Sequence, residues 1–177
     1  IMTLETDKLK YVGTLDDDLR MHGKGRINFK SGEYYEGEIA NEQPNGKGKM
    51  GYSDGRIFEG MFKDGIPNGP GRYTVPDGSY LEGNFINYLG HGQMTLRESD
   101  GGLYQGGFEN GMKSGYGKLT IPNGMTYEGE WKYDAANGKG KMTYPAGEIY
   151  EGEFSDGLRH GQGRLSNTRD DTEYEGD

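Results

Sequence analysis

The chain has 177 residues and a formal net charge of −9, which argues against nucleic acid as a partner because nucleic-acid binding needs clustered Lys and Arg. It contains no cysteine and no apolar run of membrane-spanning length, so disulfides and a transmembrane helix are excluded. Glycine accounts for 34 residues and the mean hydropathy is −0.97, a mixture typical of disorder, yet 14 Tyr, 6 Phe and a Trp indicate a packed structure.

A repeat of 23 or 24 residues organises the chain. Residues 45–60 ("NGKGKMGYSDGRIFEG") and 137–152 ("NGKGKMTYPAGEIYEG") agree at most positions. Each repeat opens with an aromatic residue or leucine that precedes a glycine by two residues, and a Gly-x-Gly signature follows in six repeats. The opening residues are Tyr11, Tyr35, Phe58, Leu81, Tyr104, Tyr127, Tyr150 and Tyr174. This period predicts a repeat array over residues 11–177, with seven repeats and the opening strand of an eighth, behind a lead-in at residues 1–10.

Each repeat is predicted to form two antiparallel strands. In 127–131 ("YEGEW") and 138–144 ("GKGKMTY"), large or small apolar residues alternate with charged ones, as expected of half-buried strands. Turn signals such as Pro76–Gly78 join the repeats, and a looser turn, such as Lys63–Asn68, is expected within them. The sequence therefore predicts an all-β, elongated and twisted single-layer antiparallel sheet of about fifteen strands, built from tandem β-hairpins.

The glycines and charges predict how neighbouring strands fit together. Each aromatic strand lies beside a Gly-x-Gly strand, where bare backbone leaves room for a large ring to lie flat. On the other face, Glu of one strand stands opposite Lys or Arg of the next. One repeat alone buries too little apolar surface to order its residues, so stacking of repeats is required.

The segments "YYEGEIANEQPNGKGKMGYSDG" (34–55) and "YEGEFSDGLRHGQGRLSN" (150–167) closely resemble the MORN (membrane occupation and recognition nexus) repeat. The resemblance covers residues 11–177 and implies a non-catalytic scaffold in the cytoplasm, at a cytoskeletal, ciliary or membrane-associated assembly. It leaves two alternatives open, since some members are accessory modules of lipid kinases or lysine methyltransferases, and phospholipid binding has been proposed for the motif. Because the net charge is −9 and no basic cluster is present, the chain is not expected to bind anionic lipid headgroups by electrostatic attraction.

Protein partners are expected on the aromatic face, because a single-layer sheet covers its apolar side only in part. A helix or peptide in an aromatic groove, or self-association through the terminal strands, would satisfy this expectation. The candidate residues are Tyr104, Phe108, Tyr127, Trp131, Tyr150 and Phe154, together with Tyr88 and Leu89 in an otherwise polar loop of the fourth repeat. An alternative is that the rings are consumed by packing on neighbouring glycines, and that Tyr88 and Leu89 are ordinary loop variation.

The alignment of the fourth repeat is itself open. Without a gap, Met94 takes a glycine position, whereas a shift of two residues lets Gly90 and Gly92 restore Gly-x-Gly. An even shift keeps every side chain on its own face, so the predicted fold survives either alignment.

No catalytic, cofactor or metal site is predicted. His22 and His160 occupy a turn or strand-start position of the repeat. At about 4.8 Å per strand and two strands per repeat, they are expected to lie roughly 55 Å apart, too far to share a metal. The acidic segments 16–18 and 170–171 lack the spacing of a calcium loop and are expected to be solvated. Strands follow the many Gly-x-Gly motifs, so these motifs cannot act as nucleotide-binding loops.

Overall fold

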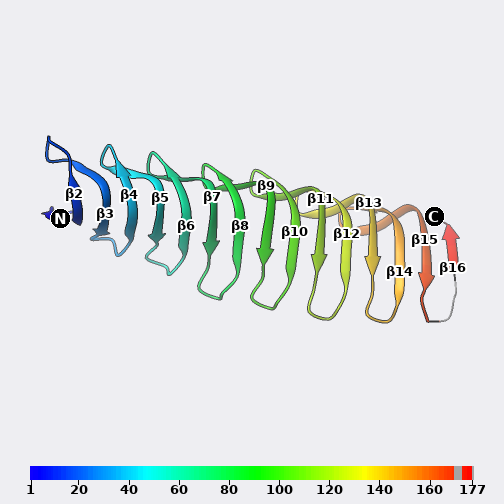
Figure 1. Ribbon diagram of the computed structural model, residues 1–177. Helices are drawn as coiled ribbons and strands as arrows, with labels where there is room; N and C mark the ends of the chain where they lie inside the picture. The colour runs from blue at the N-terminus through cyan, green and yellow to red at the C-terminus, as the bar shows by residue number, and fades with distance from the viewer. Residues whose placement is uncertain (170–172, 177) are drawn as a thin grey trace. The chain divides into compact units, whose positions relative to one another are not determined.

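The computed structural model describes residues 1–169 and 173–176, and these residues form strands and turns without any helix (Figure 1). Over this part of the chain there is consequently no helix of the length and apolarity needed to cross a membrane. The strands in chain order are β1 (Met2–Glu5), β2 (Leu9–Leu15), β3 (Met21–Phe29), β4 (Tyr34–Ala40), β5 (Gln43–Gly51), β6 (Ile57–Lys63), β7 (Ile66–Thr74), β8 (Tyr80–Ile86), β9 (Leu89–Arg97), β10 (Leu103–Glu109), β11 (Met112–Thr120), β12 (Thr126–Lys132), β13 (Ala135–Thr143), β14 (Glu148–Ser155), β15 (Leu158–Asn167) and β16 (Glu173–Gly176).

The chain divides into two compact units, Ile1–Leu89 and Gly90–Asp177. Within each unit every strand pairs antiparallel with the next strand along the chain. The main contacts of each strand are with these neighbours, so each unit is a single layer. The all-β class and the tandem hairpin topology predicted from the sequence are confirmed.

The strand count differs from the prediction at the start of the chain. The expected fifteen strands correspond to β2–β16, and β1 is added by the lead-in, where Met2 faces Gly13 and Glu5 faces Lys10 of β2. Residues 2–5 carry no repeat signature, so the periodicity could not place this strand.

The turns between repeats form as predicted, and those within repeats are tighter than predicted. At Pro76–Gly78, the Gly78 N–H donates to the Val75 carbonyl over 3.0 Å. Within the third repeat, however, β6 ends at Lys63 and β7 begins at Ile66, leaving only Asp64 and Gly65 in the turn. Both have positive φ, 49° and 85°, as the two-residue hairpin turn that matches strand twist requires.

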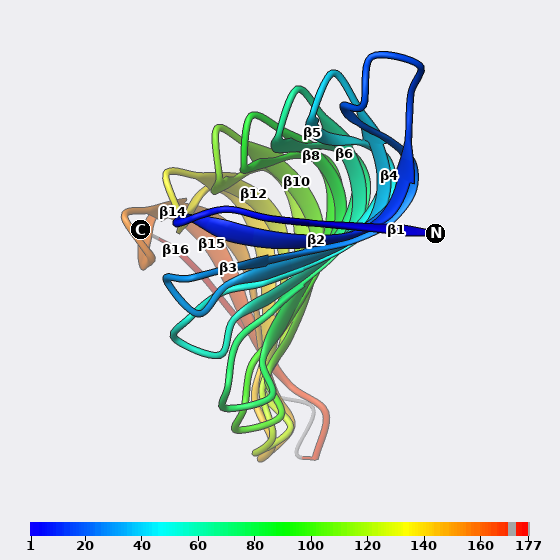
Figure 2. The same cartoon turned by 90° about the vertical axis from the view of Figure 1, so that its left-hand side faces the viewer.

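A bulge interrupts the pairing in the hairpins β2–β3, β4–β5, β6–β7, β10–β11, β12–β13 and β14–β15. Gly60 faces Gly71 but Phe62 faces Pro67, so β7 holds two more residues than β6 between these pairs. One of the extra residues is Gly69, with φ of 112°. Bulges bend a strand and increase its twist, and the strands follow curved paths in Figure 2.

The same bulge decides the alignment of the fourth repeat. Gly69, Gly92 and Gly115 all have positive φ and stand 23 residues apart. The alignment without a gap therefore holds, and Met94 takes the position that is glycine in the neighbouring repeats.

The rings that open six of the repeats lie over pairs of facing glycines, as Tyr35 illustrates; the others are Tyr11, Phe58, Tyr104, Tyr127 and Tyr150. Gly37 and Gly48 face one another in adjacent strands, and a methyl group added at Gly48 would meet Cε2 of the Tyr35 ring at 2.5 Å. The ring is fully buried, and its hydroxyl donates to the Glu38 carbonyl over 2.7 Å, at the point where the bulge breaks the pairing. The predicted role of the glycines in making room for the rings is confirmed.

We expect substitutions at a ring and at the glycine beneath it to have non-additive effects on the free energy of unfolding. Gly48→Met should cost about 1–3 kcal/mol of unfolding free energy through overpacking, and Tyr35→Leu should cost about 2–4 kcal/mol through lost packing and a lost hydrogen bond. The double variant should lose less than the sum by about 1–2 kcal/mol, because Leu makes room for Met. The sequence already carries this pair once, as Leu81 and Met94. Urea unfolding followed by circular dichroism measures all three variants.

The matched control combines Tyr35→Leu with Gly140→Met in the second unit, where the added side chain meets the Tyr127 ring instead. This control pair should be additive. Equal additivity for the facing pair would show that the ring and the glycine are independent.

Candidate interaction surfaces

The six rings expected to line an open aromatic groove are buried. Each of these side chains is at most 7% exposed: Tyr104, Phe108, Tyr127, Trp131, Tyr150 and Phe154. The expectation of an exposed aromatic groove is therefore wrong for these residues, and the alternative that packing consumes the rings describes them better. Whether a partner contacts any of them stays a prediction.

The rings close this face because they pack edge to face in a continuous chain. Tyr104 and Trp131 have ring centroids 5.0 Å apart at 84°, and Tyr127 and Phe154 have centroids 4.9 Å apart at 82°. Trp131 also contacts Tyr127 at 5.2 Å, and its indole N–H donates to the Gly117 carbonyl over 3.1 Å. Lys113 places its ammonium 5.2 Å from the Tyr104 and Trp131 rings. Such contacts stabilise the layer beyond the burial of area.

Burial also changes the acidity of the tyrosines. Desolvation raises the pKa of Tyr35, Tyr104 and Tyr127 to about 12, with a further contribution from the charges of Glu38, Asp134 and Glu130 respectively. These hydroxyls therefore remain protonated in the folded protein at neutral pH.

Tyr88 lies on an exposed hairpin turn, as the sequence predicted, and Leu89 is the first residue of β9 directly after it. Their exposed fractions are 54% and 47%, and Ile86 beside them is 44% exposed. Tyr88 has φ of 71°, a conformation that glycine adopts in other repeats, as at Gly65. Its N–H donates to the Pro67 carbonyl over 3.1 Å, which ties this turn to the preceding repeat. Their role in binding remains a prediction.

The hollow part of the first unit lies on the charged face, opposite the rings. Two adjoining cavities of about 730 and 700 Å³ share Lys47 and Glu59 and together form what we call the charged groove. Glycine backbone lines it at Gly13, Gly25, Gly37, Gly48, Gly60, Gly71 and Gly83. Side chains line it at Val12, Lys24, Arg26, Glu36, Glu38, Lys47, Lys49, Ile57, Glu59, Met61, Pro70, Arg72, Thr74 and Glu82, with Ile1 at one end.

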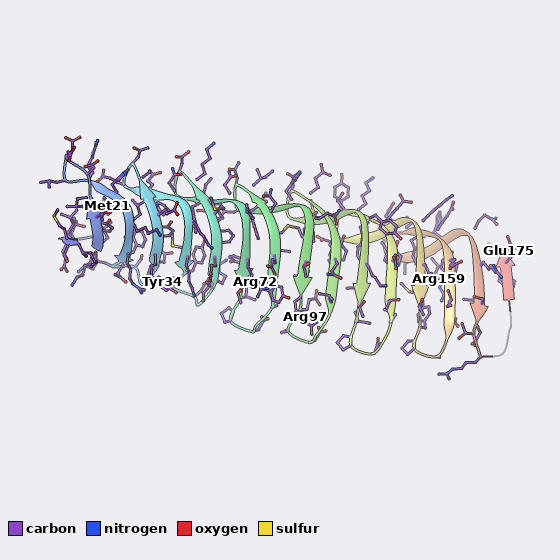
Figure 3. The ribbon with its side chains drawn as sticks, viewed as in Figure 1. Met21, Tyr34, Arg72, Arg97, Arg159 and Glu175 are labelled. Atoms are coloured by element: carbon purple, nitrogen blue, oxygen red, sulfur yellow. The ribbon has the colours of Figure 1, made fainter. Side chains whose placement is uncertain are left out.

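The predicted cross-strand ion pairs form one wall of the charged groove. Arg26 contacts Glu36 at 2.9 Å and Arg72 contacts Glu82 at 2.6 Å, with Arg72 labelled in Figure 3. The Arg72 guanidinium also lies 4.2 Å from the centroid of the Tyr80 ring. Cations on this wall are thus neutralised within the sheet.

The other wall of the charged groove carries two cations without such neutralisation. Among the described residues, neither Lys24 nor Lys47 forms an ion pair. Lys47 faces Met61 across the strands. Lys24 faces Glu38, but the Glu38 carboxylate lies over Gly46 at the bulge. Sequence reasoning treated these lysines as paired and missed them, although the missing acid opposite Lys47 is visible in the sequence.

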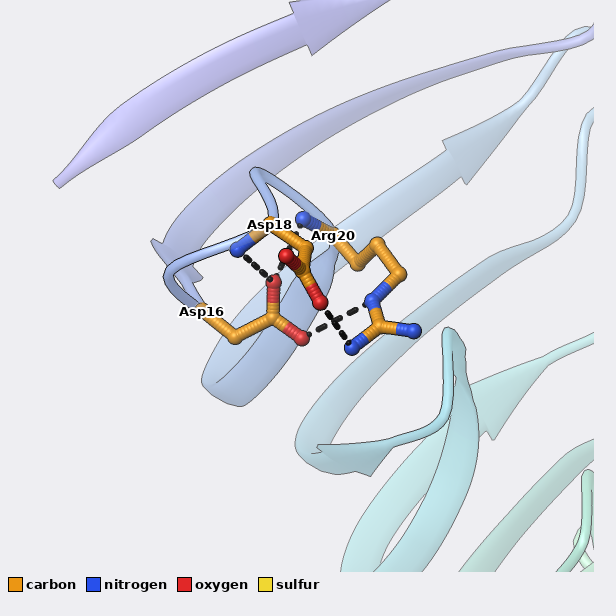
Figure 4. Close-up of polar contacts among 3 residues, drawn as sticks. All are labelled: Asp16, Asp18 and Arg20. Carbon is orange, nitrogen blue, oxygen red and sulfur yellow. Dashed lines mark hydrogen bonds and ion pairs between the residues drawn. The ribbon is translucent and has the colours of Figure 1, made fainter.

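The acidic segment at residues 16–18 is held by the protein's own cation. Figure 4 shows Arg20 contacting Asp16 at 3.0 Å and Asp18 at 2.8 Å. Hydrogen bonding from the Arg20 backbone N–H lowers the pKa of Asp16. His22 and His160 lie on different units, and no three His, Asp or Glu side chains of the described residues converge to hold a metal. The second acidic segment, 170–171, is outside the described residues.

Comparison with known proteins decides the family. A family model described as "MORN repeat" matches residues 35–55, 58–80, 104–126, 127–149 and 150–168, which is more than half of the chain. The chain belongs to the MORN-repeat family. No curated protein sequence matches it.

A solved structure has a similar fold. It is described as "SAS-4 (dCPAP) TCP domain in complex with a Proline Rich Motif of Ana2 (dSTIL) of Drosophila Melanogaster". The match has a TM-score of 0.53 and 13% sequence identity, and it covers 94% of this chain and 89% of that chain. At this identity the likeness shows the fold alone.

The MORN-repeat match omits residues 81–103, and this part of the chain departs from the repeat at several positions. Leu81 replaces the opening aromatic residue and Met94 replaces a glycine. On the charged face, Thr95 faces Gln105 where other repeats carry an ion pair such as Lys118 with Glu128.

One pair of changes within the MORN repeats bears on the charged groove. In the second unit, the Glu130 carboxylate accepts a hydrogen bond from the Lys139 backbone N–H over 3.0 Å, just after the bulge. The same two positions of the third repeat hold Met61 and Pro70. Proline has no N–H to satisfy, so the loss of the carboxylate leaves no unpaired donor.

We expect Trp131 to be a core residue in solution. Trp131→Ala should lower the unfolding free energy by about 3–5 kcal/mol, because it removes a buried ring with three aromatic or cationic neighbours. Tyr133→Ala is the matched control, since Tyr133 is 70% exposed two residues away and should change stability by about 0.5 kcal/mol or less. Urea unfolding measures both. Similar stability for the two variants would contradict the closed aromatic face.

The tyrosine pKa values predict a loss of stability at alkaline pH. Unfolded tyrosines ionise near pH 10, whereas the folded Tyr35, Tyr104 and Tyr127 ionise near 12. Between these values the folded state binds more protons, so stability that is complete below pH 10 falls as the pH rises towards 12. Unfolding midpoints measured across this range, with tyrosinate absorbance recorded in parallel, check the sign. A midpoint independent of pH would contradict it.

Proposed function

We propose that the chain is a non-catalytic protein-interaction scaffold that binds a segment of a partner protein in the charged groove of its first unit. The observation that carries this proposal is the pair of adjoining cavities of about 730 and 700 Å³, whose lining combines bare backbone with unneutralised Lys24 and Lys47. Cavities of this size accommodate several residues of a peptide.

The lining of the charged groove favours binding over catalysis. It contains no His or Ser; of its acids, Glu36, Glu59 and Glu82 are engaged in ion pairs, and the Glu38 carboxylate lies over Gly46. A general base or nucleophile needs a neighbouring group that activates it, and this lining offers none.

The similar solved structure supports a peptide as the kind of partner. That protein was solved in complex with a proline-rich motif, so a sheet with this fold can present a peptide-binding surface. The setting we propose, a cytoplasmic assembly at the cytoskeleton, a cilium or a membrane, rests on the family resemblance alone.

Blocking the charged groove should abolish partner binding. Met61→Trp places a large side chain inside it, whereas Lys63→Trp places the same side chain two residues further along β6, outside the lining. Proximity labelling in the source cells, quantified against unmodified protein, should lose a set of partners with Met61→Trp and keep them with Lys63→Trp. The outcome that contradicts the proposal is equal labelling by both variants, or loss only with Tyr88→Ser on the exposed turn.

A further inference from the structure

We propose that the charged groove takes an acidic, proline-rich segment in the polyproline II conformation, lying across the strands of the first unit. This inference rests on the proposed function and specifies the partner's chemistry. It is carried by the spacing of the repeats along the groove and by the position of its two unneutralised lysines.

The spacing of the repeats matches one turn of a polyproline II helix. Each repeat contributes two strands, and neighbouring strands lie about 4.8 Å apart, so equivalent residues recur about every 9.6 Å along the groove. Polyproline II has three residues per turn and rises about 3.1 Å per residue, or about 9.3 Å per turn. Over three repeats the mismatch is only about 1 Å, so every third residue meets an equivalent position.

Other regular conformations fit this spacing less well. Seven residues of an α-helix rise about 10.5 Å, so the mismatch grows to roughly 3 Å over three repeats. An extended strand covers one repeat in about three residues, but its side chains alternate with a period of two, so successive repeats would meet opposite faces. Polyproline II is therefore the conformation that presents one face to each repeat.

The lysines define where acids belong on the ligand. Lys24 and Lys47 stand 23 residues apart at equivalent positions of two repeats, and both line the same cavity. Acidic residues three positions apart in the ligand can thus pair with both at once. The next equivalent position is Pro70, beside Met61, so the ligand residue three further on meets an apolar surface. We therefore expect the pattern acid-x-x-acid-x-x-apolar, with proline among the intervening residues, in either chain direction.

The second unit lacks this pattern. Its cavity of about 520 Å³ is lined by Tyr116, Lys139 and Gln162 at the positions equivalent to Lys24 and Lys47. Glu153 faces Lys139 there, at the position where Met61 faces Lys47 in the first unit. Because this lining repels an acidic ligand, binding should be confined to the first unit.

Synthetic peptides test the inference directly on the full chain. The probe is a fluorescent peptide of repeated Glu-Pro-Pro triplets long enough to cover about three repeats, with binding followed by fluorescence anisotropy. Three control peptides carry Lys-Pro-Pro, flexible Glu-Gly-Gly, or Glu-Pro-Pro-Pro, in which the acids turn away from a common face. We expect the Glu-Pro-Pro peptide to bind at least about tenfold more tightly than each control.

Charge reversal locates the site. Lys24→Glu with Lys47→Glu should weaken binding of the Glu-Pro-Pro peptide about tenfold or more, since two attractions become repulsions. The control, Lys63→Glu with Lys139→Glu, makes the same change in net charge outside the charged groove and should alter binding less than about twofold. All four substituted lysines occupy exposed strand positions, so the circular dichroism spectrum should remain unchanged. Lys139 lies in the second unit and the other three lie in the first.

The outcomes separate this inference from the proposed function. Equal binding of the Glu-Gly-Gly or Glu-Pro-Pro-Pro peptide, or an equal effect of the control lysines, overturns the inference. If the peptides fail in this way while Met61→Trp still removes cellular partners, the charged groove binds proteins of another chemistry and the scaffold function stands. If Met61→Trp removes no partner and the peptide does not bind, both are wrong.

Discussion

The packing of one aromatic ring on two facing glycines is the constraint on which the rest of this structure depends. A single sheet has no second layer to bury its apolar face, so each ring must lie flat on the backbone of its own sheet. At Tyr35 this requires glycine on two adjacent strands, and it brings the hydroxyl to a carbonyl that the bulge has left without its strand partner. The bulge, the glycines and the tyrosine hydroxyl therefore form one arrangement, which the 23-residue period repeats.

This arrangement determines which face is open to a partner. Rings from successive repeats contact one another, as Tyr35 and Phe62 do at 5.1 Å, and these contacts bury them. The charged face has no such filling, because its side chains are long and pair across strands on one side of the glycine row. The cavities consequently form between charged side chains, over backbone that no side chain covers.

Local patterns in the sequence predicted the hairpins, the ring positions and the cross-strand ion pairs, because period, alternation and turn chemistry fix them. The same patterns did not predict that rings such as Trp131 and Phe154 are buried. Alternation shows which side chains share a face, but it does not show how far a bent strand brings them together. Asp64 and Gly65 show a related limit. The sequence predicted a loose turn over residues 63–68, but β7 begins at Ile66, three residues before the Gly-x-Gly signature, so only two residues are left in the turn.

Met61 and Pro70 suggest how a scaffold of this kind acquires a specific site without losing its fold. A glutamate at position 61, like Glu130 and Glu153 at the equivalent positions, would satisfy a backbone N–H after the bulge, as Glu130 does for Lys139, and it would also stand opposite Lys47. Removing that glutamate alone would leave an unpaired N–H. Proline at position 70 removes the N–H as well, so the exchange leaves the backbone satisfied and Lys47 without an opposing acid. The two changes together thus leave the backbone satisfied and, on the function proposed above, make Lys47 available to a ligand.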